Sequence, residues 1–182
     1  MQTFQEVLSR PKVAMAMGYA IAKHGDQKYG DKPYSDHLRA VAQLVHILGR
    51  PNDNWVDEVM AAALLHDVLE DTDAKPEEIE ELFGPRVLAI VKACTKTDDD
   101  LCRKCSFRRT VPALKSTDWA LPVKLADRLA NMLNSIAARS SHLNMYVREY
   151  PEFKQLLWSD GSWTELWIEL DKAFEAGAER KK

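Results

Sequence analysis

The chain has 182 residues, of which 46% are hydrophobic and 29% are charged. At roughly 150 residues per domain this length predicts about one domain, and the composition argues against intrinsic disorder. The 25 lysines and arginines are balanced by 28 acidic residues, a net charge of −3, which argues against broad nucleic-acid binding and a polybasic membrane surface. We therefore expect one domain over residues 1–182, without nucleic-acid or membrane partners; the oligomeric state stays unknown.

Cysteine usage and the N-terminal segment both point to the cytoplasm. The three cysteines, Cys94, Cys102 and Cys105, are an odd number without the pattern of a secreted disulfide framework. The N-terminal segment lacks the basic and apolar regions of a signal peptide, and the longest apolar run, 60–65, is far shorter than the ~20 residues that span a bilayer. Cys102 and Cys105 form a single CxxC, and a zinc knuckle would need two further ligands, for which Cys94 and His142 are weak candidates.

Hydrophobic residues recur with a helical period along nearly the whole chain. On the first predicted helix they share one face with a histidine: Val13, Met17, Ala20, Ile21 and His24. An irregular segment over 25–32 follows, and the next helix begins with Ser35 or Asp36 as its N-cap and ends near 49–51. Three further helices are expected, over about 54–71, 76–84 and 86–95.

The second half of the chain is less regular. Residues 98–115 are polar, charged and poorly periodic, so we predict a long loop or a mobile segment poor in helix. A strong helical period returns over 121–138, weakens after His142, and returns in an amphipathic helix from Trp163 to about Ala178. No segment alternates with a period of two for long enough to predict a strand. The expected fold class is all-α.

The helix expected over 54–71 carries an unusual concentration of ionisable groups. At about 100° per residue, four of them fall within one arc of roughly 140°: His66, Asp67, Glu70 and Asp71. Unpaired buried charge is costly, and a divalent metal would compensate it. The alternative is that this arc is simply the solvent face of the helix.

The helix over 121–138 has a stripe of polar side chains opposite its apolar face. The stripe consists of Lys124, Asp127, Asn131 and Asn134. Asp and Asn are poor helix formers, and an exposed helix face usually prefers Glu, Lys and Arg. The stripe therefore indicates a packed polar site, although an ordinary polar surface is the alternative.

Three histidines in the first third of the chain have different expected environments. His37 shares a helix face with Val41 and Leu44, where a buried core histidine is more common than a metal ligand. His46 lies on the far side of the same helix, and we expect it in solvent. His24 precedes the irregular segment, and we expect it to pack beside a site rather than to bind metal.

His37, the His66–Asp67 pair and Asp127 occur in the order H…HD…D, and this order resembles the HD-domain metal-dependent phosphohydrolases. More specifically, the sequence resembles the hydrolase domain of the RelA/SpoT family of alarmone enzymes and its stand-alone small alarmone hydrolases. The resemblance covers about 14–140 and rests on four segments: AKHGDQKYGDKPYSDH (22–37), AALLHDVLEDT (62–72), LFGPRVLAIVKACTK (82–96) and VKLADRLANM (123–132). It implies a metal core over about 14–140 with a helical C-terminal extension over 141–182.

The resemblance also implies an HD-type helical bundle that holds one Mn²⁺. The implied ligands are His37, His66, Asp67 and Asp127. The family removes the 3′-pyrophosphate of guanosine tetra- or pentaphosphate and releases pyrophosphate with GDP or GTP. Glu70 and Asp71 match the family's acidic pair beside the metal, and Asn131 matches its substrate-contacting asparagine.

This assignment agrees with the chemistry of the residues. Mn²⁺ can lower the pKa of a bound water and polarise a phosphoryl oxygen, and mixed His/carboxylate ligands suit Mn²⁺ or Fe²⁺. Glu70 lies one helical turn from His66, so it can orient or deprotonate that water, with Asp71 assisting. Substrate phosphates need positive groups, for which the candidates are Lys23, Lys28, Lys32, Lys96, Lys124 and Arg128. The substrate-binding set that we expect is Lys28, Tyr29, Lys32, Lys124, Asn131 and Asn134.

The segment before His37 departs from the family, because it is short and has Tyr29 where a basic residue is expected. An aromatic ring can stack on a purine, so the substrate is (p)ppGpp or the adenosine analogue (p)ppApp. Leu133 also stands where the family commonly has arginine. Two alternatives stay open: an HD phosphohydrolase of another nucleotide or dinucleotide phosphate, and a non-catalytic nucleotide-binding or antitoxin-like protein.

Overall fold

The computed structural model describes residues 2–96, 102–159 and 161–180 and is almost entirely helical, which confirms the predicted all-α class. The helices of the first half are α1 (Phe4–Leu8), α2 (Pro11–His24), α3 (Tyr34–Leu44), α4 (Val56–Leu65), α5 (Val68–Asp71), α6 (Pro76–Phe83) and α7 (Pro85–Cys94). Those of the second half are α8 (Arg103–Ser116), α9 (Ala120–Ala137), α10 (His142–Leu157) and α11 (Thr164–Glu179). A π-helical turn, η1 (Val45–Gly49), extends α3, and β1 (Lys28–Tyr29) and β2 (Lys32–Pro33) form a small antiparallel hairpin.

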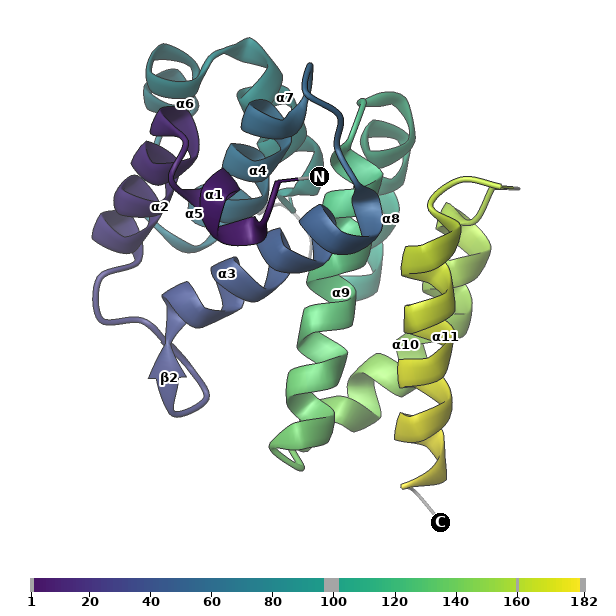
Figure 1. Ribbon diagram of the computed structural model, residues 1–182. Helices are drawn as coiled ribbons and strands as arrows, with labels where there is room; N and C mark the ends of the chain where they lie inside the picture. The colour runs from purple at the N-terminus through teal and green to yellow at the C-terminus, as the bar shows by residue number, and fades with distance from the viewer. Residues whose placement is uncertain (1, 97–101, 160, 181–182) are drawn as a thin grey trace.

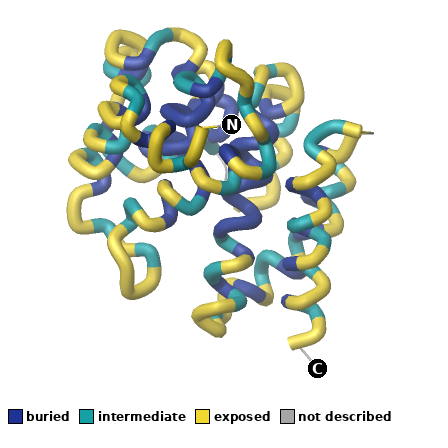
Figure 2. Tube along the Cα trace, in the orientation of Figure 1, coloured by how far each residue is buried: buried dark blue, intermediate teal, exposed yellow. Residues whose placement is uncertain are grey.

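Helix α9 is the central element of the fold. It contacts α3, α4 and α7 on one side and α8, α10 and α11 on the other, as Figure 1 shows. Most of its length is buried (Figure 2), including the polar residues Lys124 and Asp127. The polar stripe predicted on this helix therefore faces the interior at these two positions.

Helix α4 is the most deeply buried of the shorter helices, and it packs between α2, α3 and α7. Its sequence from Val59 to Leu65 is apolar on every face, which is the pattern of a helix surrounded by protein. Consequently His66 and Asp67, which follow α4 directly, are delivered to the interior of the molecule.

Several predicted elements are confirmed. The helices expected over 76–84, 86–95, 121–138 and 163–178 correspond to α6, α7, α9 and α11. The helix expected over 54–71 is instead interrupted after Leu65, and α5 begins at Val68. The helix expected to begin at Ser35 or Asp36 begins at Tyr34, because Pro33 takes the N-cap position without a side-chain cap. On α2 the buried line runs through Ala16, and Ile21 is 47% exposed, so the predicted inward position of Ile21 is wrong.

The prediction of a loop over 98–115 is wrong for most of its length. Helix α8 occupies Arg103–Ser116, and residues 98–101 lie outside the described part of the chain. Its buried side chains recur every four residues, at Ser106, Thr110 and Leu114, but two of them are polar and so weaken the hydrophobic pattern.

The hydrophobic pattern of the sequence weakens after His142, yet α10 is a continuous helix from His142 to Leu157. Its inward face is clear in the structure: Leu143, Val147, Tyr150, Phe153 and Leu157. The ring of Phe153 stacks on Phe107 of α8, with centroids 5.3 Å apart, and lies 6.1 Å from Trp167 of α11. The second-half helices are therefore joined by aromatic packing.

His46 is buried, which contradicts its predicted position in solvent. It lies in η1, where the wider π-helical turn changes the direction of the side chains relative to an uninterrupted α3. One ring nitrogen is 3.1 Å from the carbonyl oxygen of Gln2, and the ring packs against Phe4.

None of the helices in the described residues is long and apolar enough to cross a membrane.

Replacing Phe153 by alanine is expected to destabilise the protein by about 3–5 kcal/mol, the usual loss for a buried aromatic side chain. Phe153 is 1% exposed and packs between α8 and α11. Urea unfolding followed by circular dichroism measures the change. The matched control is Ile168→Ala on α11, which is 46% exposed and should change stability by at most about 0.5 kcal/mol. Equal effects of the two substitutions would contradict this packing.

Candidate metal centre

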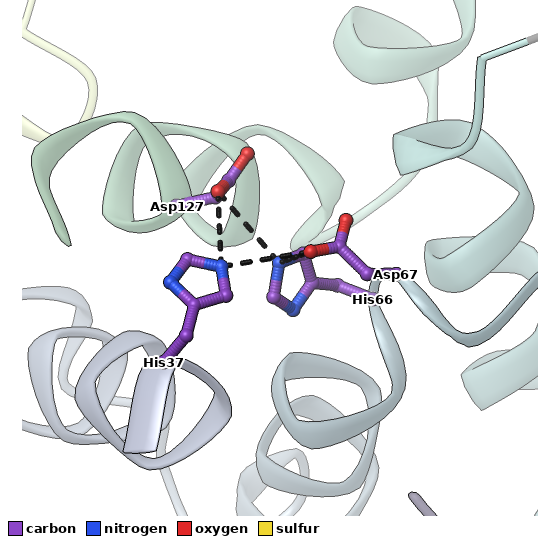
Figure 3. A group of neighbouring side chains, drawn as sticks. All are labelled: His37, His66, Asp67 and Asp127. Carbon is purple, nitrogen blue, oxygen red and sulfur yellow. Dashed lines mark ion pairs between the residues drawn. The ribbon is translucent and has the colours of Figure 1, made fainter. Parts of the chain in front are cut away.

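Four ligating side chains from three parts of the chain meet at one point (Figure 3). His37 comes from α3, His66 and Asp67 from the junction of α4 and α5, and Asp127 from α9. One ligand atom of each lies within 4.8 Å of those of the others. The group formed by these four predicted ligands is called the metal cluster below.

The distances within the metal cluster are short enough that the charges of its four groups interact directly. Asp67 Oδ2 lies 3.0 Å from His66 Nε2 and 3.5 Å from His37 Nε2. Asp127 Oδ1 lies 3.4 Å from His37 Nε2 and 3.7 Å from His66 Nε2. Each carboxylate therefore faces both imidazoles, and the four atoms surround a common centre.

The interruption between α4 and α5 allows two adjacent residues to point at this centre. In a continuous helix, neighbouring side chains project about 100° apart. His66 is the C-cap of α4, and Asp67 is the N-cap of α5 with φ −102° and ψ −4°, which departs from ideal α-helical angles within the right-handed region. The arc inferred for a continuous helix is therefore incorrect as geometry, although His66 and Asp67 do converge.

A backbone hydrogen bond orients His66 for ligation. His66 Nδ1 is 2.9 Å from the carbonyl oxygen of Ala63, which holds the proton on that nitrogen and directs Nε2 to the cluster. His66 Nε2, which faces both carboxylates, is buried without a hydrogen-bond partner in the described part of the chain. His37 Nδ1 is also buried without a partner there, but it lies on the side of the ring away from the carboxylates, which Nε2 faces. A buried nitrogen without a partner at the centre of two carboxylates is the arrangement expected of a ligand whose partner is a cation.

The electrostatics of the cluster favour added positive charge. Burial opposes protonation of His66, but the nearby carboxylates outweigh it and raise its pKa to about 10. Burial likewise opposes ionisation of Asp67 and Asp127, yet His66, His37 and, for Asp127, Lys124 hold their pKa values well below the ordinary range. The cluster therefore holds two ionised carboxylates, and a divalent cation bound by neutral imidazoles would take the place of the histidine protons.

Neighbouring side chains fix the carboxylates. Tyr34 donates a hydrogen bond to Asp67 Oδ2 (2.6 Å), and its ring stacks on His24, with centroids 4.5 Å apart. On the other side, Asn131 Nδ2 donates to Asp127 Oδ1 (2.6 Å), and the Lys124 ammonium lies 3.1 Å from Asp127 Oδ2. His24 thus packs beside the site, as predicted.

Sequence reasoning missed Tyr34. It precedes His37 by three residues on α3, so the two share a helix face. That spacing within the segment KPYSDH was the signal that could have identified it. Burial and Asp67 both raise the pKa of the Tyr34 hydroxyl, which therefore stays protonated and remains a hydrogen-bond donor.

The metal cluster lies at the edge of a cavity of about 590 Å³. Around the cluster the cavity is lined by Tyr34, Asp67, Glu70, Asp71, Lys96, Lys124, Asp127 and Asn131. Its remaining wall comes mainly from α8 and α10 and includes Arg103, Lys104, Phe107, Tyr146, Glu149 and Glu152. A space of this size with acidic, basic and aromatic walls can accommodate a nucleotide.

The two carboxylates predicted to be catalytic both line this cavity. Glu70 is held by Lys96, whose ammonium pairs with it and whose backbone N–H donates to Oε2 (3.2 Å). Asp71 is exposed and accepts a hydrogen bond from Gln27 Nε2 (3.1 Å). Their placement next to Asp67 is compatible with their predicted roles, which remain predictions.

The predicted substrate-binding residues fall into two groups. Lys124 and Asn131 line the cavity. The other four, Lys28, Tyr29, Lys32 and Asn134, are not among the described residues that line it. Lys28 and Lys32 are exposed on the β1–β2 hairpin.

Tyr29 faces the metal cluster from that hairpin. Its ring centroid is 4.6 Å from that of His37, and its hydroxyl donates to Asn131 Oδ1 (3.0 Å). Burial raises the pKa of this hydroxyl, and Asn134 is close enough to oppose part of the increase. The contacts of Tyr29 are therefore with the cluster and the amide beside it, and stacking on a purine stays a prediction.

Comparison with known proteins agrees with this fold and site. The chain belongs to the HD domain family, whose model matches residues 16–152. A Drosophila melanogaster protein named guanosine-3′,5′-bis(diphosphate) 3′-pyrophosphohydrolase MESH1 is 38% identical over 126 residues, covering 66% of this chain and 68% of that protein. A solved structure described as a metazoan ortholog of SpoT that hydrolyzes ppGpp matches with a TM-score of 0.76 at 28% identity and covers 91% of this chain and 95% of that one.

Longer bacterial relatives share the same region. The Brucella ovis protein named GTP pyrophosphokinase rsh is 38% identical over 140 residues, 72% of this chain. The match covers 18% of that relative, so the chain corresponds to less than a fifth of its length. The resemblance to HD-domain alarmone hydrolases is thereby confirmed at the level of family and fold.

Replacing Asp127 by alanine is expected to abolish divalent-metal binding at the cluster while the protein stays helical, because one of four ligands is lost. Elemental analysis after dialysis against Mn²⁺ measures the bound metal, and circular dichroism checks the fold. Asp26→Ala is the matched control, because Asp26 is exposed and outside the cluster. Equal metal content in the two variants would contradict the four-ligand assignment.

Proposed function

We propose that the protein is a metal-dependent pyrophosphohydrolase of an alarmone nucleotide. It takes (p)ppGpp or (p)ppApp, removes the 3′-pyrophosphate, and releases pyrophosphate and a nucleoside 5′-di- or triphosphate. The observation that carries the proposal is the position of the metal cluster at the edge of a cavity lined by Glu70 and basic side chains. The names of the relatives MESH1 and SpoT support the choice of substrate.

The metal that we propose is Mn²⁺, one per chain. Two imidazole nitrogens and two carboxylate oxygens suit Mn²⁺ or Fe²⁺. Four protein ligands would leave positions of a six-coordinate ion for water and substrate. When bound, such an ion lowers the pKa of a coordinated water and withdraws charge from the phosphoryl oxygen. We also propose that the protein acts in the cytoplasm.

In the proposed reaction a water oxygen forms a bond to phosphorus while the bond from phosphorus to the ribose 3′-oxygen breaks. Glu70 accepts the proton of the attacking water, the ribose 3′-oxygen takes a proton from solvent as it leaves, and Glu70 then returns its proton to solvent. Asp71 assists by orienting the same water. Lys96 pairs with Glu70 through its ammonium and its backbone N–H, and so holds that carboxylate in one orientation at the cavity.

Binding of the substrate's phosphates follows from the charge around the cavity. Lys96 and Arg128 line the cavity, and Lys124 adds a buried positive charge next to Asp127. Asn131 is oriented by Tyr29 and Asp127 and is proposed to contact the sugar or phosphate. Lys28, Lys32 and Asn134 remain part of the proposed substrate-binding set, at the hairpin side of the cluster.

A second candidate substrate is another nucleotide or a dinucleotide phosphate. It is favoured by one observation: the hairpin that carries Lys28 and Lys32 projects both lysines to solvent instead of into the cavity. A purely nucleotide-binding, antitoxin-like role has no need for Glu70 and the complete metal cluster. Turnover measured side by side on ppGpp, ppApp and dinucleotide phosphates, with product identification, separates the three.

Replacing Glu70 by glutamine is expected to lower kcat for the alarmone by about 10²-fold or more, the scale of a positioned acid–base group, with metal content unchanged. Steady-state kinetics with Mn²⁺ and elemental analysis are the measurements. Glu81→Gln on α6 is the matched control because Glu81 is exposed and does not line the cavity among the described residues. A kcat within twofold of the unmodified enzyme would remove Glu70 from the proposed mechanism.

Tyr29 is tested by two substitutions. If its ring stacks on the purine, Tyr29→Ala should raise KM by about 5-fold or more, the lower end of base–aromatic stacking, while Tyr29→Phe keeps KM. The enzyme should then hydrolyse ppApp at least as well as ppGpp, because stacking tolerates either purine. If Tyr29→Phe already lowers kcat, the hydroxyl bond to Asn131 is the important contact. Unchanged KM in Tyr29→Ala would exclude stacking.

A further inference from the structure

Cys102 and Cys105 are joined by a disulfide at the start of α8. Both residues are exposed, and Cys102 is also part of the cavity wall. Cys102 is the N-cap of α8, where its sulfur accepts a hydrogen bond from the backbone N–H of Cys105 (3.0 Å). An exposed CxxC pair next to positive charge, at the N-terminus of a helix, is the setting in which thiolates form and disulfides exchange readily.

The bridge encloses two residues of the cavity wall. Arg103 and Lys104 lie between the two cysteines and both line the cavity. Arg103 pairs with Glu149 at 3.0 Å, and Lys104 pairs with Glu152, so both reach across to α10. The bridge therefore fixes the backbone that carries the basic side chains of this wall.

The metal cluster does not depend on this wall. Its ligands belong to α3, the α4–α5 junction and α9. Opening the bridge would free the first turn of α8 and leave these ligands in place. A change at the bridge should consequently alter how tightly the cavity holds an anion, and should leave the chemistry at the cluster largely unaffected.

We propose that Cys102 and Cys105 form a reversible thiol–disulfide switch that sets the affinity of the cavity for its phosphorylated substrate. The proposal rests on the proposed function only for the identity of that substrate. In the bridged state Arg103 and Lys104 are held at the cavity. In the dithiol state they must be ordered when the substrate binds, which weakens binding.

The switch is a two-electron thiol–disulfide exchange. The oxidant is an external disulfide, either oxidised glutathione or the disulfide of another protein. One cysteine loses its proton, attacks a sulfur of the external disulfide and displaces one thiolate. The second cysteine then attacks the mixed disulfide, forms the Cys102–Cys105 bond and displaces the other thiolate. The two cysteine protons end on the two released thiols, and reduction is the reverse.

The test uses the full chain equilibrated in defined mixtures of reduced and oxidised glutathione. Native alkylation followed by mass spectrometry counts the free thiols of the pair, while Cys94 is buried and separate from it. For each state, KM and kcat are measured on ppGpp and ppApp with Mn²⁺. The Kd of inorganic pyrophosphate, measured by calorimetry, gives a readout that does not depend on turnover.

We expect the dithiol state to show a KM and a pyrophosphate Kd about 3-fold or more above those of the bridged state, the scale of ordering one or two long side chains. The kcat should change by less than twofold. The control is the double variant Cys102→Ser/Cys105→Ser, because serine is a good N-cap and keeps the start of α8. It should bind like the dithiol state and give no response to glutathione.

Two results would overturn the switch. In one, both thiols stay open to alkylation even in the most oxidising mixture. In the other, the bridge forms and opens but the pyrophosphate Kd is the same in both states. Absence of alarmone hydrolysis in both states contradicts the proposed function instead, and the pyrophosphate Kd then still decides the switch.

Discussion

The structure depends on two carboxylates, Asp67 and Asp127, that are ionised within the protein and face the same two imidazoles. Leaving one buried charge without its partner typically costs about 3–5 kcal/mol, so the helices that carry these groups are constrained to meet. Helix α9 brings Asp127 to the centre, α3 brings His37, and the end of α4 brings His66 and Asp67. The same concentration of negative charge that constrains the fold would favour a divalent cation at this centre.

Because the cluster requires two adjacent ligands, it also determines the local backbone. His66 and Asp67 converge where the helix is interrupted, and the interruption falls after the fully apolar stretch of α4. The bond from His66 to Ala63 and the bond from Tyr34 to Asp67 then hold the two side chains in ligating orientations. The apolar packing of α4 thus places His66 and Asp67 in the interior, and the polar bonds around them orient their side chains.

The sequence predicted the parts of the molecule in which local pattern and chemistry agree. The sequence identified the four residues of the metal cluster, because their types and their order along the chain are those of metal ligands in the HD family. It identified α9 because the hydrophobic period of that helix is strong. Tyr34 was missed because its spacing from His37 places the two on one helix face but does not show that the tyrosine hydroxyl meets Asp67. The placement of Lys28 and Lys32 could not be decided, because a two-residue turn determines where the hairpin directs them.

The α8–α10 side of the cavity could not be predicted because its stability is non-local. Exposed ion pairs such as Arg103–Glu149 contribute only about 0–1 kcal/mol each, so they cannot by themselves create α8. The stacked rings of Phe107 and Phe153, which belong to different helices far apart in the sequence, add apolar burial that no window around α8 contains. The cavity therefore combines a wall that contains the metal cluster with a wall whose position depends on weaker contacts. A wall of the second kind is where substrate affinity can be changed without disturbing the metal ligands, and Cys102 and Cys105 lie at its edge.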